Sequence, residues 1–530
     1  MRRVLPFILI LSVCKLQAQI TGYYGSDTNI CATARDYLND IEFDDNGNMF
    51  LTGRTDRTFP GDAEVYYFTP YIKFNQQGHV ALSLRSTVAE TFDIKETSDG
   101  NLVLCGTGNG LLCNTVCKKD MWIYKMDTQG NNLWGRSFGN LVNDGNDIAY
   151  DMTIDPNDNI IVAGEVYITG KDIRPFLCSL DQNGDTVWTR CYGASTGWQQ
   201  GNCVTVSSGN NIYVGGSGQS SGPLIMKHYP NGDLWWAKAY SSGFGNVFGI
   251  YQLMNGSFNC VGDIVLSGVN HLCMFNIDPN GNVSWAKVIT CSEANQKIFT
   301  EDTYRDASDN IYWTGYYYDG TSFTVYTPFL IKMDANGNLT WAKHYTDGDA
   351  KGKAIHRHPV QGLVWGAEFI SNANPGLYSH QPEYWLIHMA EDGLTDCFSD
   401  LPLNIQNHTL TVYNKSFSRF KDYGTNDPMP DTAVHPIYKK QKCSSPFNNI
   451  NEIDERFVNI YPNPSSDVVC LEMNSEYIGA PYQVTDLLGR VHREGIVSNN
   501  HLRIDIADLS SGIYLLRLVG ISNAYRFIKQ

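Results

Sequence analysis

The chain has 530 residues, of which 18% are charged and 12% aromatic, and its formal net charge is −16. A chain of this length is expected to form more than one domain, and its aromatic content is too high for wholesale disorder. The acidic balance leaves no basic surface for a phosphate backbone, so we expect no nucleic-acid binding.

The first residues predict export. Arg2 and Arg3 precede an apolar run from Val4 to Val13, and the small residue Ala18 follows shortly after. This order is typical of a secretory signal peptide, so we expect residues 1–18 to be removed. The run is too short to cross a bilayer, and no later stretch approaches the ~18 apolar residues of a spanning helix. We therefore expect no integral membrane span.

Two turn motifs then alternate along the chain. The first is Asp44-Asp-Asn-Gly47-Asn48, followed by a short apolar run. The second is Asp127-Thr-Gln-Gly130, with a Trp shortly after the glycine. Copies of the first motif centre on Gly47, Gly100, Asp158, Asn210, Gly256, Asp309 and Gly362. Copies of the second centre on Gly130, Gly184, Gly232, Gly281 and Gly337, with degenerate ones at Gly78 and Gly393. Asp or Asn followed by Gly favours tight hairpin turns.

Each period of about 50 residues therefore holds two hairpins, which is typical of a four-stranded propeller blade. The predicted fold class is all-β: a seven-bladed β-propeller over residues 19–397, followed by a small antiparallel β-sandwich. We expect the repeated Trp side chains to pack between neighbouring blades. The segment Ile20–Gly25 is predicted to supply the outer strand of the last blade and so close the ring. The unit resembles the β-propeller repeats of exported bacterial proteins, which implies an architecture and says almost nothing of a ligand.

One position upstream of the first turn is rich in aspartate. Across the repeats it holds Asp40, Asp93, Asp151, Cys203, Gly249, Asp302 and Ile355. Clustered carboxylates favour hard cations, so the four aspartates are candidate metal ligands and Ca²⁺ is the candidate cofactor. The alternative, which we favour, is that each Asp accepts hydrogen bonds from backbone N–H groups of the neighbouring blade. The missing carboxylates argue against a symmetric site.

No catalytic or cofactor-binding residue stands out. Gly218–Gly222 fits the nucleophile-elbow pattern, but no helix pattern follows it. His356 and His358 share one face of a predicted strand without a third ligand. The aromatic runs Tyr316–Tyr318 and Tyr66–Phe68 could bind sugars or proteins, or pack as blade strands.

The chain has 14 cysteines, and an exported protein can oxidise them. Cys191 and Cys203 flank one loop and are a candidate disulfide. Two further candidate pairs are Cys113 with Cys117 and Cys397 with Cys443. Cys105, Cys178, Cys260 and Cys470 fall inside predicted strands, where we expect buried thiols.

Residues 398–454 break the period, and we expect an irregular extension of the propeller followed by a linker. Residues 455–530 read as short strands and turns, as in a small antiparallel sandwich. Three motifs stand in order here: Tyr461-Pro-Asn-Pro464, Asp486-Leu-Leu-Gly-Arg490 and Leu509-Ser-Ser-Gly-Ile-Tyr514.

This segment closely resembles the type A C-terminal sorting domain of the type IX secretion system of Bacteroidota. The resemblance implies that Pro462, Asn463, Pro464, Gly489, Arg490 and Gly512 belong to the sorting motifs, and that the secretion machinery is a partner. It further implies export across the outer membrane, removal of the domain, and release or attachment to surface lipopolysaccharide.

We therefore expect a secreted or outer-membrane-surface protein that is a non-catalytic binding or adhesion module for a glycan, a protein or a mineral cation. The alternative is a polysaccharide lyase or glycoside hydrolase on a propeller scaffold, because fold alone does not decide function. A third hypothesis is a purely structural spacer at the cell surface.

Overall fold

The structure of the protein is a computed structural model. It describes residues 21–26, 33–58, 66–76, 80–86, 90–109, 119–138, 146–168, 172–194, 197–219, 222–241, 243–292, 296–319, 325–345, 349–359, 362–369, 383–393, 398–419, 432–434, 437–440, 458–461, 465–473, 479–486, 490–499, 501–518 and 524–529. The predicted signal peptide lies outside these residues. The chain divides into two compact units, Met1–Pro446 and Phe447–Gln530. Every regular element among the described residues is a β-strand, which confirms the all-β class.

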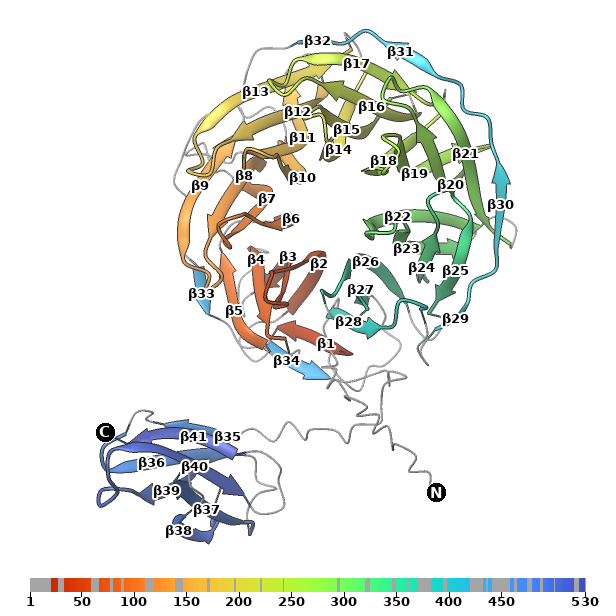
Figure 1. Ribbon diagram of the computed structural model, residues 1–530. Helices are drawn as coiled ribbons and strands as arrows, with labels where there is room; N and C mark the ends of the chain where they lie inside the picture. Colours follow the sequence, from red (N-terminus) through yellow and green to blue (C-terminus); the bar gives the residue numbers. More distant parts are fainter. Residues whose placement is uncertain are drawn as a thin grey trace, which may run out of the picture. The chain divides into compact units, whose positions relative to one another are not determined.

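The described part of the first unit forms seven antiparallel sheets. Figure 1 shows them around a central opening, each with one strand at the opening and further strands towards the periphery. From the inner strand outwards the sheets are β2 (Thr33–Phe43), β3 (Met49–Thr58), β4 (Tyr66–Phe74), β5 (Val80–Ser86); β6 (Glu90–Glu96), β7 (Leu102–Asn109), β8 (Lys119–Met126), β9 (Asn132–Phe138); β10 (Ile148–Ile154), β11 (Ile160–Ile168), β12 (Asp172–Leu180), β13 (Thr186–Gly193); β14 (Gln199–Val206), β15 (Ile212–Gly218), β16 (Gly222–His228), β17 (Leu234–Ala239); β18 (Gly245–Gln252), β19 (Phe258–Leu266), β20 (Val269–Ile277), β21 (Val283–Cys291); β22 (Gln296–Arg305), β23 (Ile311–Asp319), β24 (Thr327–Met333), β25 (Leu339–His344); and β26 (Ala350–Arg357), β27 (Leu363–Phe369), β28 (Glu383–Met389), β1 (Thr21–Ser26).

The predicted turns connect these strands. In the turn between β2 and β3, Gly47 N donates to Asp44 O at 2.8 Å, and the side chain of Asp44 accepts from Asn48 N at 2.7 Å. Gly47 has a φ of 75°, and Asp158 reaches 61° in the corresponding turn of another sheet. Asp and Asn tolerate this left-handed conformation better than other residues with a side chain, which explains their use where the glycine is missing.

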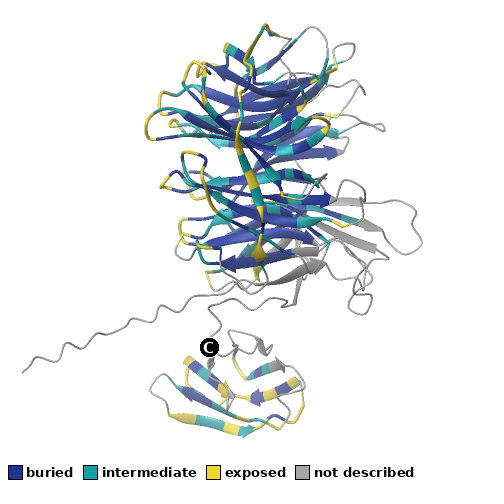
Figure 2. Ribbon diagram, turned by 90° about the vertical axis from the view of Figure 1, so that its right-hand side faces the viewer, coloured by how far each residue is buried: buried dark blue, intermediate teal, exposed yellow. Residues whose placement is uncertain are grey.

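The hydrophobic core lies between neighbouring sheets. One cluster joins Val103 and Cys105 of β7 to Val162 of β11, and another joins Tyr213 of β15 to Phe258 of β19. Figure 2 shows buried strands and exposed turns in this unit. The first sheet also packs against the last, where Leu38 and Leu51 share a cluster with Ala354 and Val364, so the sheets form a closed ring.

The repeated Trp side chains pack between neighbouring sheets, as predicted. A Cβ added at Gly184 would lie 2.6 Å from the ring of Trp134, and one at Gly232 would lie 2.7 Å from Trp188. The indole of Trp134 also donates to Gln182 O at 2.9 Å. Where a Trp precedes the turn, as at Gly184 and Gly232, only glycine satisfies both the positive φ and the close approach of the indole ring.

The first strand completes the last sheet, which confirms the predicted closure. β1 pairs antiparallel with β28, with Thr21 opposite Ile387 and Tyr24 opposite Tyr384. The last sheet therefore contains strands from the beginning and from the end of the ring, and the backbone hydrogen bonds between β1 and β28 close the ring.

The segment expected to be an irregular extension differs from that expectation. Its described part contains β29 (Ser399–Asp400), β30 (Leu403–Asn407), β31 (Tyr413–Lys415), β32 (Ser418–Arg419), β33 (Thr432–Val434) and β34 (Ile437–Lys440). They pair in this order with β25, β21, β17, β13, β5 and β1, each as a fifth strand. These six strands thus lie at the periphery of the ring, and they meet the sheets in the reverse of the order in which the chain forms them (Figure 1). Outer strands present unpaired backbone groups, and short strands can pair with these without a hydrophobic pattern of their own.

The second unit holds two antiparallel sheets. One contains β35 (Val458–Tyr461), β36 (Val468–Met473) and β39 (His501–Asp505). The other contains β38 (Val491–Ile496), β37 (Pro481–Asp486), β40 (Gly512–Leu518) and β41 (Ala524–Lys529). Val469 and Ile504 of the first sheet share one core with Val484 and Leu516 of the second.

Candidate functional site

Each innermost strand of the ring carries a β-bulge next to the aspartate position. In β2 the register shifts between Leu38 and Asp40, and in β6 it shifts between Thr91 and Asp93. The residues that follow the bulges are Asp40, Asp93, Asp151, Cys203, Gly249, Asp302 and Ala354. Bulges reorient side chains, and they recur at functional sites and at the rims of closed sheets.

The last of these positions corrects the sequence alignment, which had Ile355 there. In the final turn His358 N donates to Gly362 O, whereas in the first turn Asp44 N donates to Asn48 O. Gly362 therefore corresponds to Asn48 and not to Gly47. The aligned position moves back by one residue, to Ala354.

All four aspartates hydrogen-bond to the neighbouring sheet. Asp40 Oδ2 accepts from Ile94 N at 3.0 Å, and Asp93 Oδ2 accepts from Met152 N at 2.8 Å. Asp151 Oδ2 accepts from Val204 N at 2.6 Å, and Asp302 Oδ2 accepts from Ile355 N at 2.8 Å. These are the bonds described by the alternative that the sequence analysis favoured. Each carboxylate joins the inner strand of one sheet to that of the next.

A tyrosine makes the equivalent connection where the aspartate is missing. A Cβ at Gly249 would lie 2.4 Å from Thr303 Oγ1, so no larger residue fits there. Instead, the hydroxyl of Tyr251 donates to Thr303 O at 2.5 Å. In the sequence, this replacement of an aspartate by the nearby Tyr251 is indicated only by Gly249 at the aspartate position. The glycine leaves the space that the side chains of Thr303 and Tyr251 occupy.

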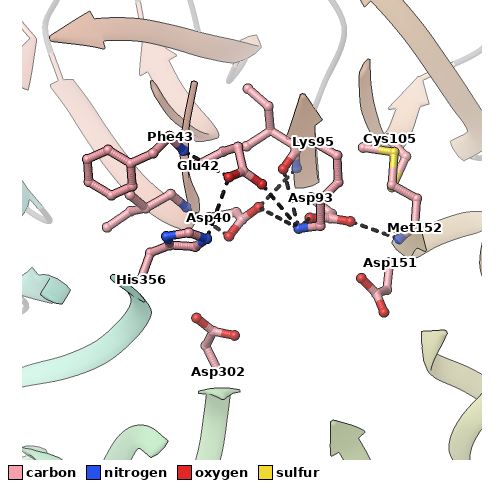
Figure 3. A network of polar contacts seen from close by, with 12 residues as sticks. Asp40, Glu42, Phe43, Asp93, Lys95, Cys105, Asp151, Met152, Asp302 and His356 are labelled. Carbon is pink, nitrogen blue, oxygen red and sulfur yellow. Dashed lines mark hydrogen bonds and ion pairs between the residues drawn. The ribbon is translucent and has the colours of Figure 1, made fainter. Parts of the chain in front are cut away.

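Lys95 lies among the carboxylates. Its Nζ is 2.7 Å from Asp93 Oδ1, 3.8 Å from Glu42 Oε2 and 4.0 Å from Asp40 Oδ2. Figure 3 shows this group, with Asp151 of β10 and Asp302 of β22 on other inner strands around the opening. Sequence reasoning missed Lys95 and Glu42, because only the tertiary structure brings β2 and β6 side by side.

His356 completes the group on the side of β26. Its Nε2 is 3.5 Å from Glu42 Oε1, and its ring lies 5.4 Å from that of Phe43. The second histidine of the predicted pair, His358, packs against Phe43 and His388. Burial lowers the pKa of His358 to about 4, so this imidazole is neutral at physiological pH.

The pKa values of this group reflect burial and mutual interaction. Burial raises the pKa of Asp40 and Asp151 well above the ordinary value, and that of Asp302 to about 7. Burial alone would lower the pKa of Lys95, but attraction by Asp93, Asp40 and Glu42 raises it well above its ordinary value. Lys95 therefore stays charged and supplies the positive charge within the carboxylate group.

Further ion pairs join β3 to β6 and β22 to β26. Arg54 Nε is 2.8 Å from Asp56 Oδ1, and its Nη1 is 3.1 Å from Glu90 Oε2. Farther round the ring, Lys353 Nζ is 2.6 Å from Glu301 Oε2. These charged side chains also pair with one another.

The described residues include no group of three or more His, Cys, Asp or Glu side chains arranged to hold a metal ion. The Ca²⁺ site at Asp40, Asp93, Asp151 and Asp302 stays a prediction. The four carboxylates fit a hard cation by chemistry, but each already accepts a backbone hydrogen bond, and Lys95 occupies the space between two of them.

The other motifs singled out from the sequence pack as parts of strands. Gly218 pairs with Gly222 across the β15–β16 hairpin, where a nucleophile elbow would need a helix; Ser220 lies outside the described residues. Tyr316 and Tyr318 stack on Phe299, whereas Tyr317 faces the other side and bonds to His344 Nδ1 at 2.7 Å.

The side chains of Tyr66–Phe68 lie outside the described residues.

The predicted Cys191–Cys203 disulfide is wrong. Both cysteines are buried, in β13 and β14, and neither forms a disulfide. Cys105, Cys178 and Cys260 are buried free thiols, as predicted, whereas Cys470 is free but only partly buried. The remaining candidates Cys113, Cys117, Cys397 and Cys443 lie outside the described residues.

Two of the three sorting motifs are partly described in the second unit. Arg490 N donates to Asp486 Oδ1 at 3.0 Å, and Arg490 Nε donates to Asp486 Oδ2 at 2.7 Å, so this motif closes its own turn. Gly512 begins β40, next to the Tyr514 hydroxyl that donates to Ser510 O at 3.0 Å. Pro462, Asn463, Pro464 and Gly489 lie outside the described residues.

Three of the solved structures similar to the chain each share 10% sequence identity with it. PorZ, a surface component of the type IX secretion system of Porphyromonas gingivalis, has a TM-score of 0.30, with 93% of this chain and 81% of that chain covered. A Dyadobacter fermentans protein of unknown function scores 0.37, with 70% and 99% covered. An α-L-arabinanase of Penicillium chrysogenum scores 0.33, with 70% and 98% covered. Likenesses at these scores carry no functional argument. No curated protein matches the chain.

The C-terminal unit has a clear relative. Residues 459–529 match the family described as the secretion system C-terminal sorting domain. The described part of the chain contains no helix long and apolar enough to cross a membrane. The chain therefore carries a C-terminal sorting domain of the type IX secretion system, and it is a secreted or cell-surface protein.

Proposed function

We propose that the first unit is a seven-bladed β-propeller, and that this type IX cargo acts outside the cell as a non-catalytic binding or adhesion module. The seven antiparallel sheets around one opening, and the two-hairpin repeat that builds them, support the propeller. We further propose that residues 1–18 are a signal peptide, that the propeller proper covers 19–397, and that the source belongs to the Bacteroidota.

The observation that carries the non-catalytic role is the engagement of the inner charged residues. Asp40, Asp93, Asp151 and Asp302 hold backbone N–H groups of the next sheet, and Lys95 neutralises two of them. A catalytic acid or base needs access to the substrate proton. Carboxylates that connect the sheets are tied to the stability of the ring instead.

A specific observation favours the alternative, a propeller-scaffold polysaccharide lyase or glycoside hydrolase. Burial raises the pKa of Glu165 to about 7. A carboxyl group that stays protonated near neutral pH is what a glycosidase needs as its general acid. Glu165→Gln is the variant that would remove this acid.

The test uses the chain from residue 19 to 530. It is incubated with a panel of polysaccharides and with outer-membrane surface material, with Ca²⁺ or with a chelator. Saturable binding without chain shortening supports the binding module, and binding that needs Ca²⁺ supports the aspartate site. Chain shortening that Glu165→Gln abolishes would replace the proposal with the enzyme. The absence of both binding and turnover would favour a structural spacer.

A further inference from the structure

One outer hairpin differs from the repeat at two positions that touch each other. In the equivalent turns an aspartate accepts hydrogen bonds from two backbone N–H groups; these residues are Asp127, Asp181, Asp278 and Asp334. The turn between β16 and β17 has Tyr229 there. Its backbone is unchanged, because Gly232 N still donates to Tyr229 O at 2.9 Å. The hairpin thus loses the aspartate bonds, and it presents a tyrosine that is 42% exposed.

The second difference is Trp235, at the bulge that follows the turn. The equivalent residues in the other hairpins are smaller: Leu133, Val187, Ser284 and Thr340. Trp235 is 47% exposed, and its ring lies 4.9 Å from that of Tyr229 at an interplanar angle of 4°. Two large rings therefore lie parallel at the surface, where the repeat elsewhere has smaller side chains.

The indole is held in place from below. Lys227 is 4% exposed, and its Nζ lies 3.8 Å from the centroid of the Trp235 ring. The same Nζ donates to Pro279 O of the next sheet at 3.1 Å. A cation over the ring face, itself fixed by a hydrogen bond, restricts rotation of the indole before any ligand arrives.

Polar groups border the ring pair. Asp233 Oδ1 lies 3.2 Å from Arg190 Nε and 3.8 Å from Arg419 Nη1, and Asp233 Oδ2 accepts from Asn231 Nδ2 at 2.9 Å. The side chains of Asp233 and Arg419 are 49% and 43% exposed. An exposed carboxylate, on Asp233, thus lies in the same hairpin as the ring pair, and an exposed guanidinium reaches it from Arg419 of β32, the strand paired with β13 of the preceding sheet.

We propose that Tyr229 and Trp235 form a stacking site for the sugar rings of a polysaccharide. This inference rests on the proposed binding function and assigns it a ligand class and a place. A pyranose ring has a face of C–H groups, which packs on an aromatic ring, and a border of hydroxyl groups, which hydrogen-bond to carboxylate and guanidinium. The exposed, stacked rings offer the first kind of contact, and Asp233 of the same hairpin with its partner Arg419 offers the second. A protein hot spot instead favours an apolar centre shielded from water.

The test returns each position to the residue type of the repeat. Tyr229→Asp restores the turn aspartate, and Trp235→Thr restores the residue of another hairpin, so both variants are expected to fold. Val187→Thr, at the equivalent bulge of the neighbouring sheet, is the matched control. Binding of the chain from residue 19 to 530 to soluble plant, fungal and bacterial polysaccharides is measured by affinity electrophoresis, and melting temperature is measured in parallel.

We expect the two reverted variants to lose at least tenfold in affinity for the polysaccharide that the wild type binds, with an unchanged or higher melting temperature for Tyr229→Asp. The control is expected to bind as the wild type does. Reverted variants that bind equally well would overturn the stacking site and leave the binding module intact. Wild-type binding to surface proteins alone would overturn the ligand class, and binding to nothing would reject the proposed function as well.

Discussion

Replacing Lys95 with Met tests whether the inner charged group stabilises the ring. The change keeps much of the side-chain volume and removes the ammonium that lies 2.7 Å from Asp93 and within 4.0 Å of Glu42 and Asp40. Removing one partner of a buried pair costs about 3–5 kcal/mol, whereas a surface pair is worth about 0–1. The Lys95 side chain is 34% exposed and that of Asp93 is 6% exposed, so the site lies between these limits. We expect a loss of about 1–3 kcal/mol at pH 8.

The pH dependence gives the sign of this effect. Lys95 has a raised pKa in the folded state, so its contribution is fully present below its ordinary value and is lost only above it. Without the ammonium, the carboxylates nearby repel one another wherever they are charged. The deficit of Lys95→Met against the wild type is therefore expected to be largest at pH 8 and to shrink on acidification, because the pKa of Asp40 is raised well above its ordinary value and this carboxylate takes up a proton.

The assay is urea unfolding followed by circular dichroism at several pH values, with melting as a check; a loss of this size lowers the melting temperature by roughly 1–4 °C. Lys343→Met is the control, because Lys343 pairs at 2.6 Å with an Asp400 side chain that is 88% exposed. That variant is expected to change stability by less than about 0.5 kcal/mol. A Lys95→Met protein as stable as the control at pH 8, or one whose deficit grows on acidification, would refute the reasoning.

Three further predictions concern pH, packing and export. Burial raises the pKa of Asp302 in the folded protein to about 7, so this residue contributes stability at a pH below its ordinary pKa, and the contribution is lost as the pH rises through 7. Asp302→Asn is expected to flatten this part of the pH profile of stability in urea titrations, and an unchanged profile would contradict the raised pKa. The methyl group of Gly184→Ala would meet the Trp134 ring at 2.6 Å at a φ of 78°, whereas that of Gly256→Ala would meet open space at a φ of 82°. Gly184→Ala is therefore expected to lower the free energy of unfolding by about 1–3 kcal/mol more than Gly256→Ala, and equal losses would rule out the packing role. Deletion of residues 447–530 is expected to retain the protein inside the outer membrane, as followed by cell fractionation, and continued surface display would argue against the sorting function.

Much of the local structure could be predicted from the sequence. The Asp-x-x-Gly turns, the period of short strands and the Trp that follows each turn are local patterns, and each has a local physical cause. Gly184 illustrates this, because its turn needs a positive φ and its surface meets the Trp134 ring, and the same combination recurs at Gly232, Gly281, Gly337 and Gly393. The closing strand β1 could also be predicted, because its sequence resembles the outer strands that it replaces.

The inner site could be predicted only in part. The aspartates were recognisable by their place in the repeat, and so was the hydrogen-bonded alternative. Lys95 and Glu42 were not, because they lie on different strands and meet only when β6 packs beside β2. The last repeat shifted the alignment by one residue because its turn ends on Gly362, a difference that only the hydrogen bond from His358 reveals.

The sequence by itself therefore determined the repeat, its strands and turns, and the sorting domain, because these depend on residue order over short distances. Only the tertiary structure decided which carboxylate faces which backbone amide, how Tyr229 and Trp235 meet at the surface, and which sheets the short strands β29 to β34 join. The pairing of Asn404 with Thr290 shows why. A two- to five-residue strand at an outer edge is held by backbone hydrogen bonds, which carry no side-chain signature along the chain.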